Sequence, residues 1–162
     1  MTESRAHVWV IPLSFLVALM LTLIPMPDWA APFRPEWLGM TVIYWCLALP
    51  RRVGTGYAFV LGLLLDVAKG ALMGQHALGL TVVAYLTLRL HQRIRVFPLW
   101  QQALSVGAML AIHLLIVLWV YGATGQAPDS ALYWAPLSTS VLLWPWVFIL
   151  LRDIRRRSGL TG

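Results

Sequence analysis

Residues 50–76 read PRRVGTGYAFVLGLLLDVAKGALMGQH, and this stretch decides the fold. It opens with Arg51 and Arg52, continues as an apolar segment, and carries one acid, Asp66, near the far end of that segment. Arginines are costly in hydrocarbon and are stabilised among anionic lipid headgroups, so the pair predicts a turn at a membrane surface. The apolar segment after the turn predicts a membrane-spanning helix over residues 53–67.

The composition of the whole chain extends this interpretation. Of the 162 residues, 60% are hydrophobic and 11% are charged, whereas an average soluble domain is about half apolar and about a quarter charged. A water-soluble fold with this composition could not cover its apolar surface. We therefore expect an all-α protein, an integral membrane bundle of six transmembrane helices that forms one domain over residues 1–162. The predicted spans cover residues 8–24, 36–49, 53–67, 75–88, 98–121 and 131–151.

The first two predicted spans are the least regular. Residues 8–24 are longer than the apolar region of a usual signal peptide, so we expect an uncleaved span. Residues 36–49 would cover only about 21 Å as a helix, which is short for a crossing, although a bilayer thins around a short span at modest cost. Between them, residues 25–35 contain four prolines and predict an external loop, because they cannot sustain a helix.

The distribution of basic residues predicts the orientation. Ten of the twelve lie before the first span, in the 50–52 turn, in residues 89–97 or in the C-terminal tail, and the other two are Arg34 and Lys69. By the positive-inside rule, both termini are expected in the cytoplasm. The same rule explains the net charge of +6 without a nucleic acid partner. Four spans are the competing count, if residues 36–49 and 53–67 are re-entrant.

Several features are expected at the membrane surface. Residues 89–97 have Leu90, Ile94 and Phe97 at helical spacing among arginines, which predicts a short interfacial segment on the cytoplasmic leaflet. The basic tail after residue 151 is expected to fray. Tryptophan favours both membrane boundaries, and the expected belts are Trp9, Trp100, Trp144 and Trp146 on the inner side and Trp29, Trp37, Trp119 and Trp134 on the outer side.

Asp66 is the sharpest single feature of the sequence. An acid within a membrane span usually marks a functional site, but Lys69 lies three residues further along the helix and could neutralise the acid at the membrane edge. Ala58, Gly62 and Asp66 are spaced by four, so they share one face, and small residues on it predict close helix packing. Gly70 and Gly74 repeat this spacing, but they lie between two predicted spans. In that place glycines favour a turn over a packing contact.

The histidines and the cysteine predict no catalytic or metal site. His76 is expected to be a polar residue near the outer headgroups. His113 lies in the middle of a span, where a hydrogen-bonded core histidine is favoured over a proton relay because no second titratable group is visibly paired with it. Cys46 is the only cysteine and is expected to pack as a small apolar residue. The spacing of these residues matches no metal motif.

The remaining patterns argue against an enzyme. No nucleophile motif is present, and the GTG at 54–56 lacks the strand that a dinucleotide site needs. We therefore expect no cofactor and no catalysis. The acids outside the termini are too dispersed in the sequence for a membrane-embedded catalytic cluster, and they are Asp28, Glu36, Asp66 and Asp129.

Five motifs in order over nearly the whole chain carry a family resemblance. They are FRPEW at 33–37, IYWCLALPRRVGTG at 43–56, GLLLDVAKGALMGQHAL at 62–78, LWQQAL at 99–104 and LLWPW at 142–146. With this order and spacing, the chain resembles the MreD family of rod shape-determining membrane proteins, of the proteobacterial type.

The resemblance implies a place in the elongasome, the machinery that inserts peptidoglycan along the side wall of rod-shaped cells. MreD-like proteins associate with MreC, a single-span protein, and through it with the MreB cytoskeleton, the RodA glycosyltransferase and its penicillin-binding transpeptidase. The family is similar in fold to the six-helix substrate-binding components of energy-coupling vitamin transporters, an analogy that does not carry function. Membrane lipids are further expected partners, and self-association stays open.

The candidate residues for structural or partner contacts follow from these motifs and from the packing face. They are Arg34, Pro35, Tyr44, Trp45, Ala58, Gly62, Asp66, Gly70, Gly74 and His76. Two functions compete for them: a non-enzymatic scaffold that maintains cell shape, and a component that binds or transports a small molecule or lipid intermediate. A binder should have a polar-lined internal cavity that reaches Asp66 or His113, whereas a scaffold should be solidly packed there and have an exposed groove between helices.

Overall fold

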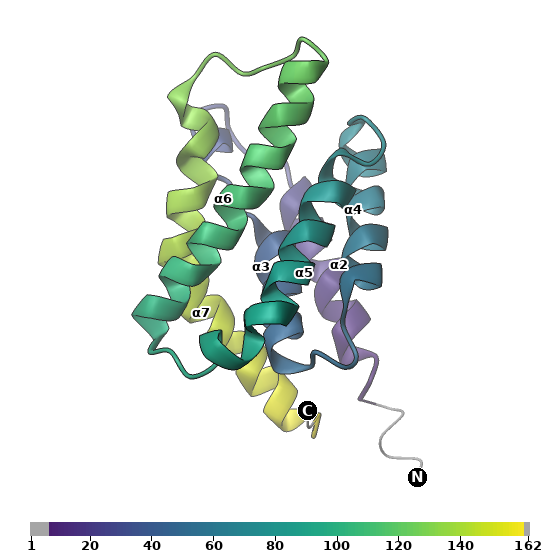
Figure 1. The fold of residues 1–162 in the computed structure, drawn as a ribbon, viewed down its shortest axis with the longest axis vertical. Coiled ribbons are helices and arrows are strands. Elements are labelled where there is room, and N and C mark those ends of the chain that lie inside the picture. Colours follow the sequence, from purple (N-terminus) through teal and green to yellow (C-terminus); the bar gives the residue numbers. More distant parts are fainter. Residues whose placement is uncertain (1–6, 161–162) are drawn as a thin grey trace.

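The computed structural model describes residues 7–160, and within these residues the chain is helical, without a strand. Among the described residues, six α-helices are present in the order that the sequence predicts (Figure 1). Two short 3-10 helices, η1 (Ala31–Phe33) and η2 (Ala131–Trp134), lie in the loops. The α-helices are α2 (Val10–Leu23), α3 (Trp37–Ala48), α4 (Thr55–Lys69), α5 (Gln75–Ile94), α6 (Leu99–Ala123) and α7 (Ala135–Arg157).

The connections divide the bundle into two ends. The start of α2, the end of α7 and the turns that follow α3 and α5 lie at one end, which we call the termini end (Figure 1). The opposite end, the loop end, carries the connections that follow α2, α4 and α6. The alternation of the helices therefore puts the basic segments of the sequence at the termini end and Arg34 and Lys69 at the loop end.

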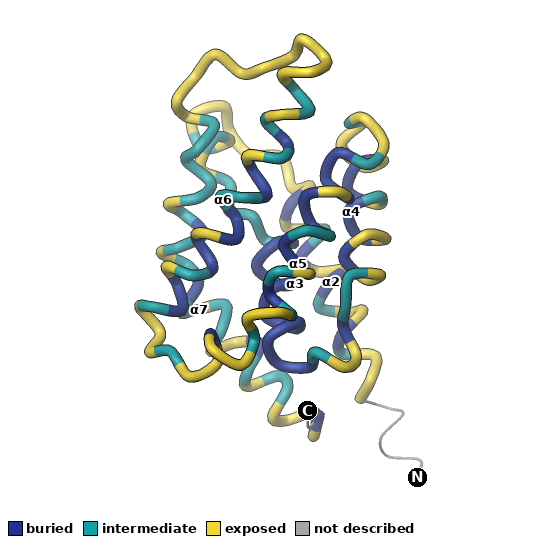
Figure 2. Tube along the Cα trace, in the orientation of Figure 1, coloured by how far each residue is buried: buried dark blue, intermediate teal, exposed yellow. Residues whose placement is uncertain are grey.

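Helix α3 is the centre of the molecule. Every residue from Leu38 to Ala48 is buried, as Figure 2 shows for the middle of the bundle, and a helix that is apolar on all sides is expected to be enclosed in this way. Trp45 is fully buried, and its Nε1 donates a hydrogen bond to Ser14 Oγ of α2 at 2.8 Å. This bond assigns Trp45 a structural role that the sequence leaves open.

Three predictions about local structure are wrong. Residues 89–94 continue α5, so they do not form a separate interfacial segment, and Ile94 is buried. Helix α7 extends to Arg157 instead of fraying after residue 151. Basic residues in the last turn are stabilised by the negative end of the helix dipole, which favours both extensions. Trp144 is fully buried and donates from Nε1 to Gln102 Oε1 at 3.2 Å, so it belongs to the core and not to an interfacial belt.

Helices α4 and α5 pack closely at one glycine. The predicted face of α4 is confirmed, because Ala58, Gly62 and Asp66 are all buried. A Cβ added at Gly62 would collide with the backbone of His76 and Ala77 in α5. The turn between the two helices also follows the prediction, since Gly70 and Gly74 have φ values of 64° and 97°, which favour glycine.

The described helices differ in their capacity to cross a membrane alone. Two helical segments, Leu99–Ala123 and Ala131–Arg157, are long and apolar enough by length and composition, and α2 is a shorter apolar helix. Helices α3 and α4 have 12 and 15 residues, fewer than the roughly 20 that a typical bilayer core requires.

Candidate functional site: a polar network at the loop end

Asp66 links α4 to the start of α5. Its carboxylate is fully buried and accepts hydrogen bonds from the backbone N–H groups of Gly74 and His76, both at 2.9 Å, and of Ala77 at 3.4 Å. These groups belong to the first turn of α5, whose backbone donors have no partner within the helix. The carboxylate therefore caps α5 and balances the positive end of its dipole.

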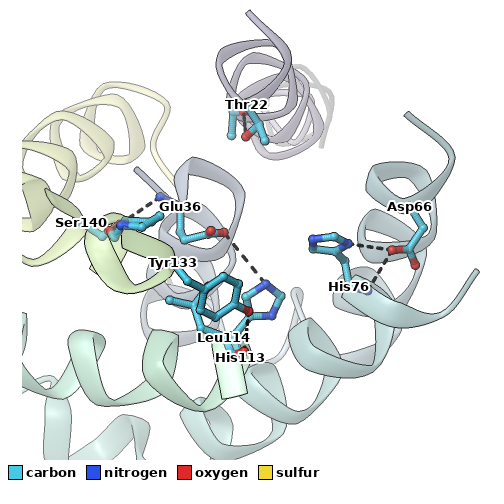
Figure 3. A network of polar contacts seen from close by, with 10 residues as sticks. Thr22, Glu36, Asp66, His76, His113, Leu114, Tyr133 and Ser140 are labelled. Carbon is cyan, nitrogen blue, oxygen red and sulfur yellow. Dashed lines mark hydrogen bonds and ion pairs between the residues drawn. The ribbon is translucent and has the colours of Figure 1, made fainter. Parts of the chain in front are cut away.

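His76 is the side-chain partner of Asp66. Its Nδ1 lies 2.8 Å from Asp66 Oδ1, and no ion pair joins Asp66 to Lys69 within residues 7–160. His76 is 5% exposed, so the prediction of a residue among the headgroups is wrong. The His76 ring lies beside the Asp66 carboxylate, with its far edge turned toward Glu36 and His113 (Figure 3).

His113 of α6 lies beyond His76 and has an acidic neighbour. Its ring centroid is 5.8 Å from that of His76, and its Nε2 is 4.0 Å from Glu36 Oε2. The expectation that His113 lacks a titratable neighbour is therefore wrong. The ring is 1% exposed and its Nδ1 lies against Gly79, where an added Cβ would strike it.

Glu36 completes the row from the side of α3. Its backbone N–H donates to Ser140 Oγ of α7 at 2.9 Å, and the Ser140 hydroxyl donates to Pro136 O at 2.6 Å. These two bonds fix the start of α3 against α7. The network thus forms a row of side chains across the loop end (Figure 3). In order along the row, its members are Asp66 of α4, His76 of α5, His113 of α6 and Glu36, the residue before α3. Two acids that the sequence analysis considered dispersed belong to one network.

A cavity of about 400 Å³ adjoins this network. Glu36, His76 and His113 supply its polar lining together with Lys69, while Leu114 and Val117 contribute apolar wall. Tyr133 closes another side, and its hydroxyl donates to Leu114 O at 2.6 Å. The cavity reaches His113 and is partly polar, but it is open to the surface and mostly apolar, so it meets the criterion set above for a binding protein only in part.

A second hollow is apolar and lies along the helices. It measures about 260 Å³, runs between α2 and α7, and has Trp37 and Thr41 of α3 as its floor. Leu13 and Val17 of α2 and Leu150 of α7 line it, and each of the three is about half exposed or more. This groove between helices meets one part of the criterion set for a scaffold, whereas the cavity at His113 contradicts the other part, which was solid packing there.

The other candidate residues have structural contacts. The Arg34 guanidinium donates to Thr22 O at 2.7 Å and to Ile24 O at 2.5 Å, which satisfies the carbonyl end of α2. Pro35 is buried beside it. Tyr44 packs edge-on against Trp45 and Phe148, with ring centroids 5.3 and 5.7 Å away. No group of three His, Cys, Asp or Glu side chains that could hold a metal ion exists among residues 7–160.

Sequence reasoning missed Glu36 and Ser140. In the sequence, Glu36 is only one of four dispersed acids outside the termini, and no motif singles out Ser140, whose hydroxyl also donates within its own helix. The sequence does contain a signal for Glu36, because this acid lies directly before the apolar segment that forms α3. A charged side chain at the start of a buried helix is costly unless it meets a partner.

Comparisons with known proteins place the chain in a family. The model of the family described as rod shape-determining protein MreD matches residues 3–154. The chain belongs to the MreD family. The rod shape-determining protein MreD of Haemophilus influenzae is 37% identical over 146 residues, which cover 88% of each chain.

Family membership supports a membrane-associated role in cell shape, and the family is not known as an enzyme family. No solved structure matches the chain. The expected similarity to vitamin transporter components therefore has no support from the solved structures.

Proposed function

We propose that this member of the MreD family is a non-enzymatic scaffold of the elongasome that crosses the bacterial inner membrane six times. The proposal rests on the family match over residues 3–154 together with the apolar groove between α2 and α7. In this role the chain would contact MreC directly. The MreB cytoskeleton, RodA and its penicillin-binding transpeptidase would be reached through MreC.

The fold supports six spans with both termini in the cytoplasm. The basic segments gather at the termini end, where the positive-inside rule would place the cytoplasm. Large apolar side chains cover the outer surface, including Leu13, Leu142 and Trp146 at 59, 76 and 74% exposure, and such a surface suits lipid and not water. Helix α3 is short, but it is enclosed by its neighbours and need not match the bilayer thickness itself.

The groove suits a single transmembrane helix. Its lining along α2 runs from Val10 to Leu21, a rise of about 17 Å along the helix axis. The lining is apolar apart from the hydroxyls of Ser14 and Thr41, and Thr41 already donates to Trp37 O. Helices associate in membranes through such packed surfaces, since lipid offers no hydrophobic driving force. MreC, as a single-span protein, would fill the groove with its membrane helix.

Site-specific photocrosslinking in rod-shaped cells tests the partner. A photoreactive residue at Leu13, Val17 or Leu150 should crosslink to MreC. Leu64 of α4 and Leu104 of α6 are matched controls, because both are exposed apolar positions away from the groove. Equal crosslinking from the controls, or crosslinks from the groove only to a second copy of this chain, would overturn the proposal.

A topology reporter tests the orientation separately. A fusion at the C-terminus that is active only in the periplasm should stay inactive, whereas the same reporter inserted after Gly125, in the α6–α7 loop, should be active. Activity at the C-terminus would contradict an even number of spans with cytoplasmic ends.

A further inference from the structure

The loop-end cavity has an unused acceptor at its inner wall. Among residues 7–160, the only ion-pair partner of the Glu36 carboxylate is His113, at a distance of 4.0 Å that exceeds a hydrogen bond. The Glu36 side chain is 18% exposed and lines the cavity. A carboxylate at a partly buried position is costly unless donors satisfy it, so the cavity has a place for a donor from outside the chain.

His76 supplies a second acceptor. An ionised Asp66 carboxylate can only accept, so the 2.8 Å contact assigns the donated proton to His76 Nδ1. A neutral imidazole that donates from Nδ1 presents a lone pair at Nε2. That edge of the ring is turned toward Glu36 and His113 (Figure 3). The inner wall of the cavity therefore offers a carboxylate and an imidazole lone pair, which together match a group with several N–H donors.

Lys69 adds the opposite charge to the lining of the cavity. It is the only lysine in the chain, it is exposed at the end of α4, and it lines the cavity. No ion pair occupies its ammonium within residues 7–160. The lining also has apolar wall, to which Leu114, Val117 and Leu132 contribute. A bound molecule would thus meet an anion, an aliphatic wall and a cation.

We propose that this cavity binds a zwitterion, a protonated primary amine joined by a short aliphatic link to a phosphate or carboxylate. The ammonium donates to Glu36 and His76, and the anionic group pairs with Lys69. An ammonium has three donors, and a ligand with both charges leaves neither Glu36 nor Lys69 uncompensated. The volume of about 400 Å³ lies within the range of small-molecule sites. This binding site goes beyond the scaffold role and does not depend on it.

Two sources share this chemistry, a phospholipid with an ethanolamine head group and a free zwitterion such as O-phosphoethanolamine. The first arm of the test uses the full chain in detergent, mixed with equal amounts of phosphatidylethanolamine and phosphatidylcholine, and counts the retained lipids by native mass spectrometry. Phosphatidylcholine keeps the charges but has no N–H donor, so the ethanolamine lipid should be retained at least about tenfold over it. The second arm titrates O-phosphoethanolamine against phosphocholine by calorimetry.

Variants connect the result to the cavity. Glu36→Gln should abolish the preference for the amine, and Lys69→Met should weaken retention of both head groups. Asp28→Asn is the matched control, because Asp28 is an exposed acid in the loop that precedes α3 and does not line the cavity. Thermal melting of each variant shows that it is folded.

Each outcome decides the proposal. A preference only for the intact lipid assigns the head group as the ligand, and binding of free O-phosphoethanolamine assigns a soluble source. The absence of a preference in both arms overturns the site, as does a preference that persists in folded Glu36→Gln. Crosslinking to MreC from Leu13 is measured in the same variants, and its loss or persistence reports on the scaffold role alone.

Discussion

The two acids of the loop-end network lie in one row of side chains and have opposite surroundings. Asp66 is fully buried, yet three backbone N–H groups and His76 donate to it. Glu36 is more exposed, yet its only ionic neighbour among residues 7–160 is His113 at 4.0 Å. The comparison teaches that depth in a membrane protein does not by itself identify a functional acid. The acid whose acceptors are already occupied supports the fold, and the one with free acceptors is available to a ligand.

The largest effect is expected for Asp66→Asn. The substitution removes the charge and one acceptor oxygen, so buried donors in the first turn of α5 lose their partner. Loss of a buried charged partner costs about 3 kcal/mol or more. The melting temperature in detergent and the amount of protein in the membrane should both fall. Normal protein levels combined with rounded cells would instead indicate a functional role for this acid.

The next effect is expected for Gly62→Ala, which tests the packing that positions Asp66. The new Cβ would collide with the backbone of His76 and Ala77, and overpacking of this kind costs about 1–3 kcal/mol. Gly56→Ala is the matched control on the same helix, because a Cβ there meets nothing within 4 Å. Melting temperatures that fall equally in both variants would show that the contact between α4 and α5 is not responsible.

Gly79→Ala tests the position of His113 beside His76, and we expect a smaller loss of stability than for Gly62→Ala. Its Cβ would strike His113 Nδ1, so the imidazole must shift relative to Glu36. We expect a loss of about 1 kcal/mol of stability and a clear loss of amine preference in the lipid retention assay. Unchanged retention in a folded variant would show that the position of His113 does not matter for the cavity.

The smallest effect on stability is expected for Glu36→Gln. The backbone N–H of residue 36 still donates to Ser140, and the lost carboxylate had no close donor. The free energy of unfolding should change by about 0.5 kcal/mol or less, measured beside Asp66→Asn in the same detergent. A destabilisation as large as that of Asp66→Asn would remove the distinction between the two acids.

The helices were predictable because their signals are local. Proline-rich residues 25–35, the arginines at 51 and 52, and Gly70 with Gly74 each interrupt an apolar run, and each interruption is a loop or turn in the structure. The prediction was wrong at the ends of α5 and α7, where arginines extend the last turn. A run of charged residues at a helix end can either lie outside the helix or extend it. The burial of neighbouring residues such as Ile94 decides which of the two occurs.

The candidate site was predictable only in part. The small-residue face of α4 follows from spacing along one helix, so Ala58, Gly62 and Asp66 were placed correctly. The partner of Asp66 was not, because Lys69 is near in sequence while His76 is brought close by the turn into α5. Trp144 was misplaced for a similar reason, since its partner Gln102 belongs to another helix.

The sequence by itself determined the helical class, the number and approximate bounds of the helices and the gathering of basic residues at one end, because hydrophobicity and charge act along each segment separately. Only the tertiary structure decided that Asp66 is saturated, that Glu36 meets His113, and that a polar cavity and an apolar groove exist together. These features depend on how helices far apart in the chain are placed against one another, and pairwise packing in three dimensions is not encoded in the spacing of any single segment.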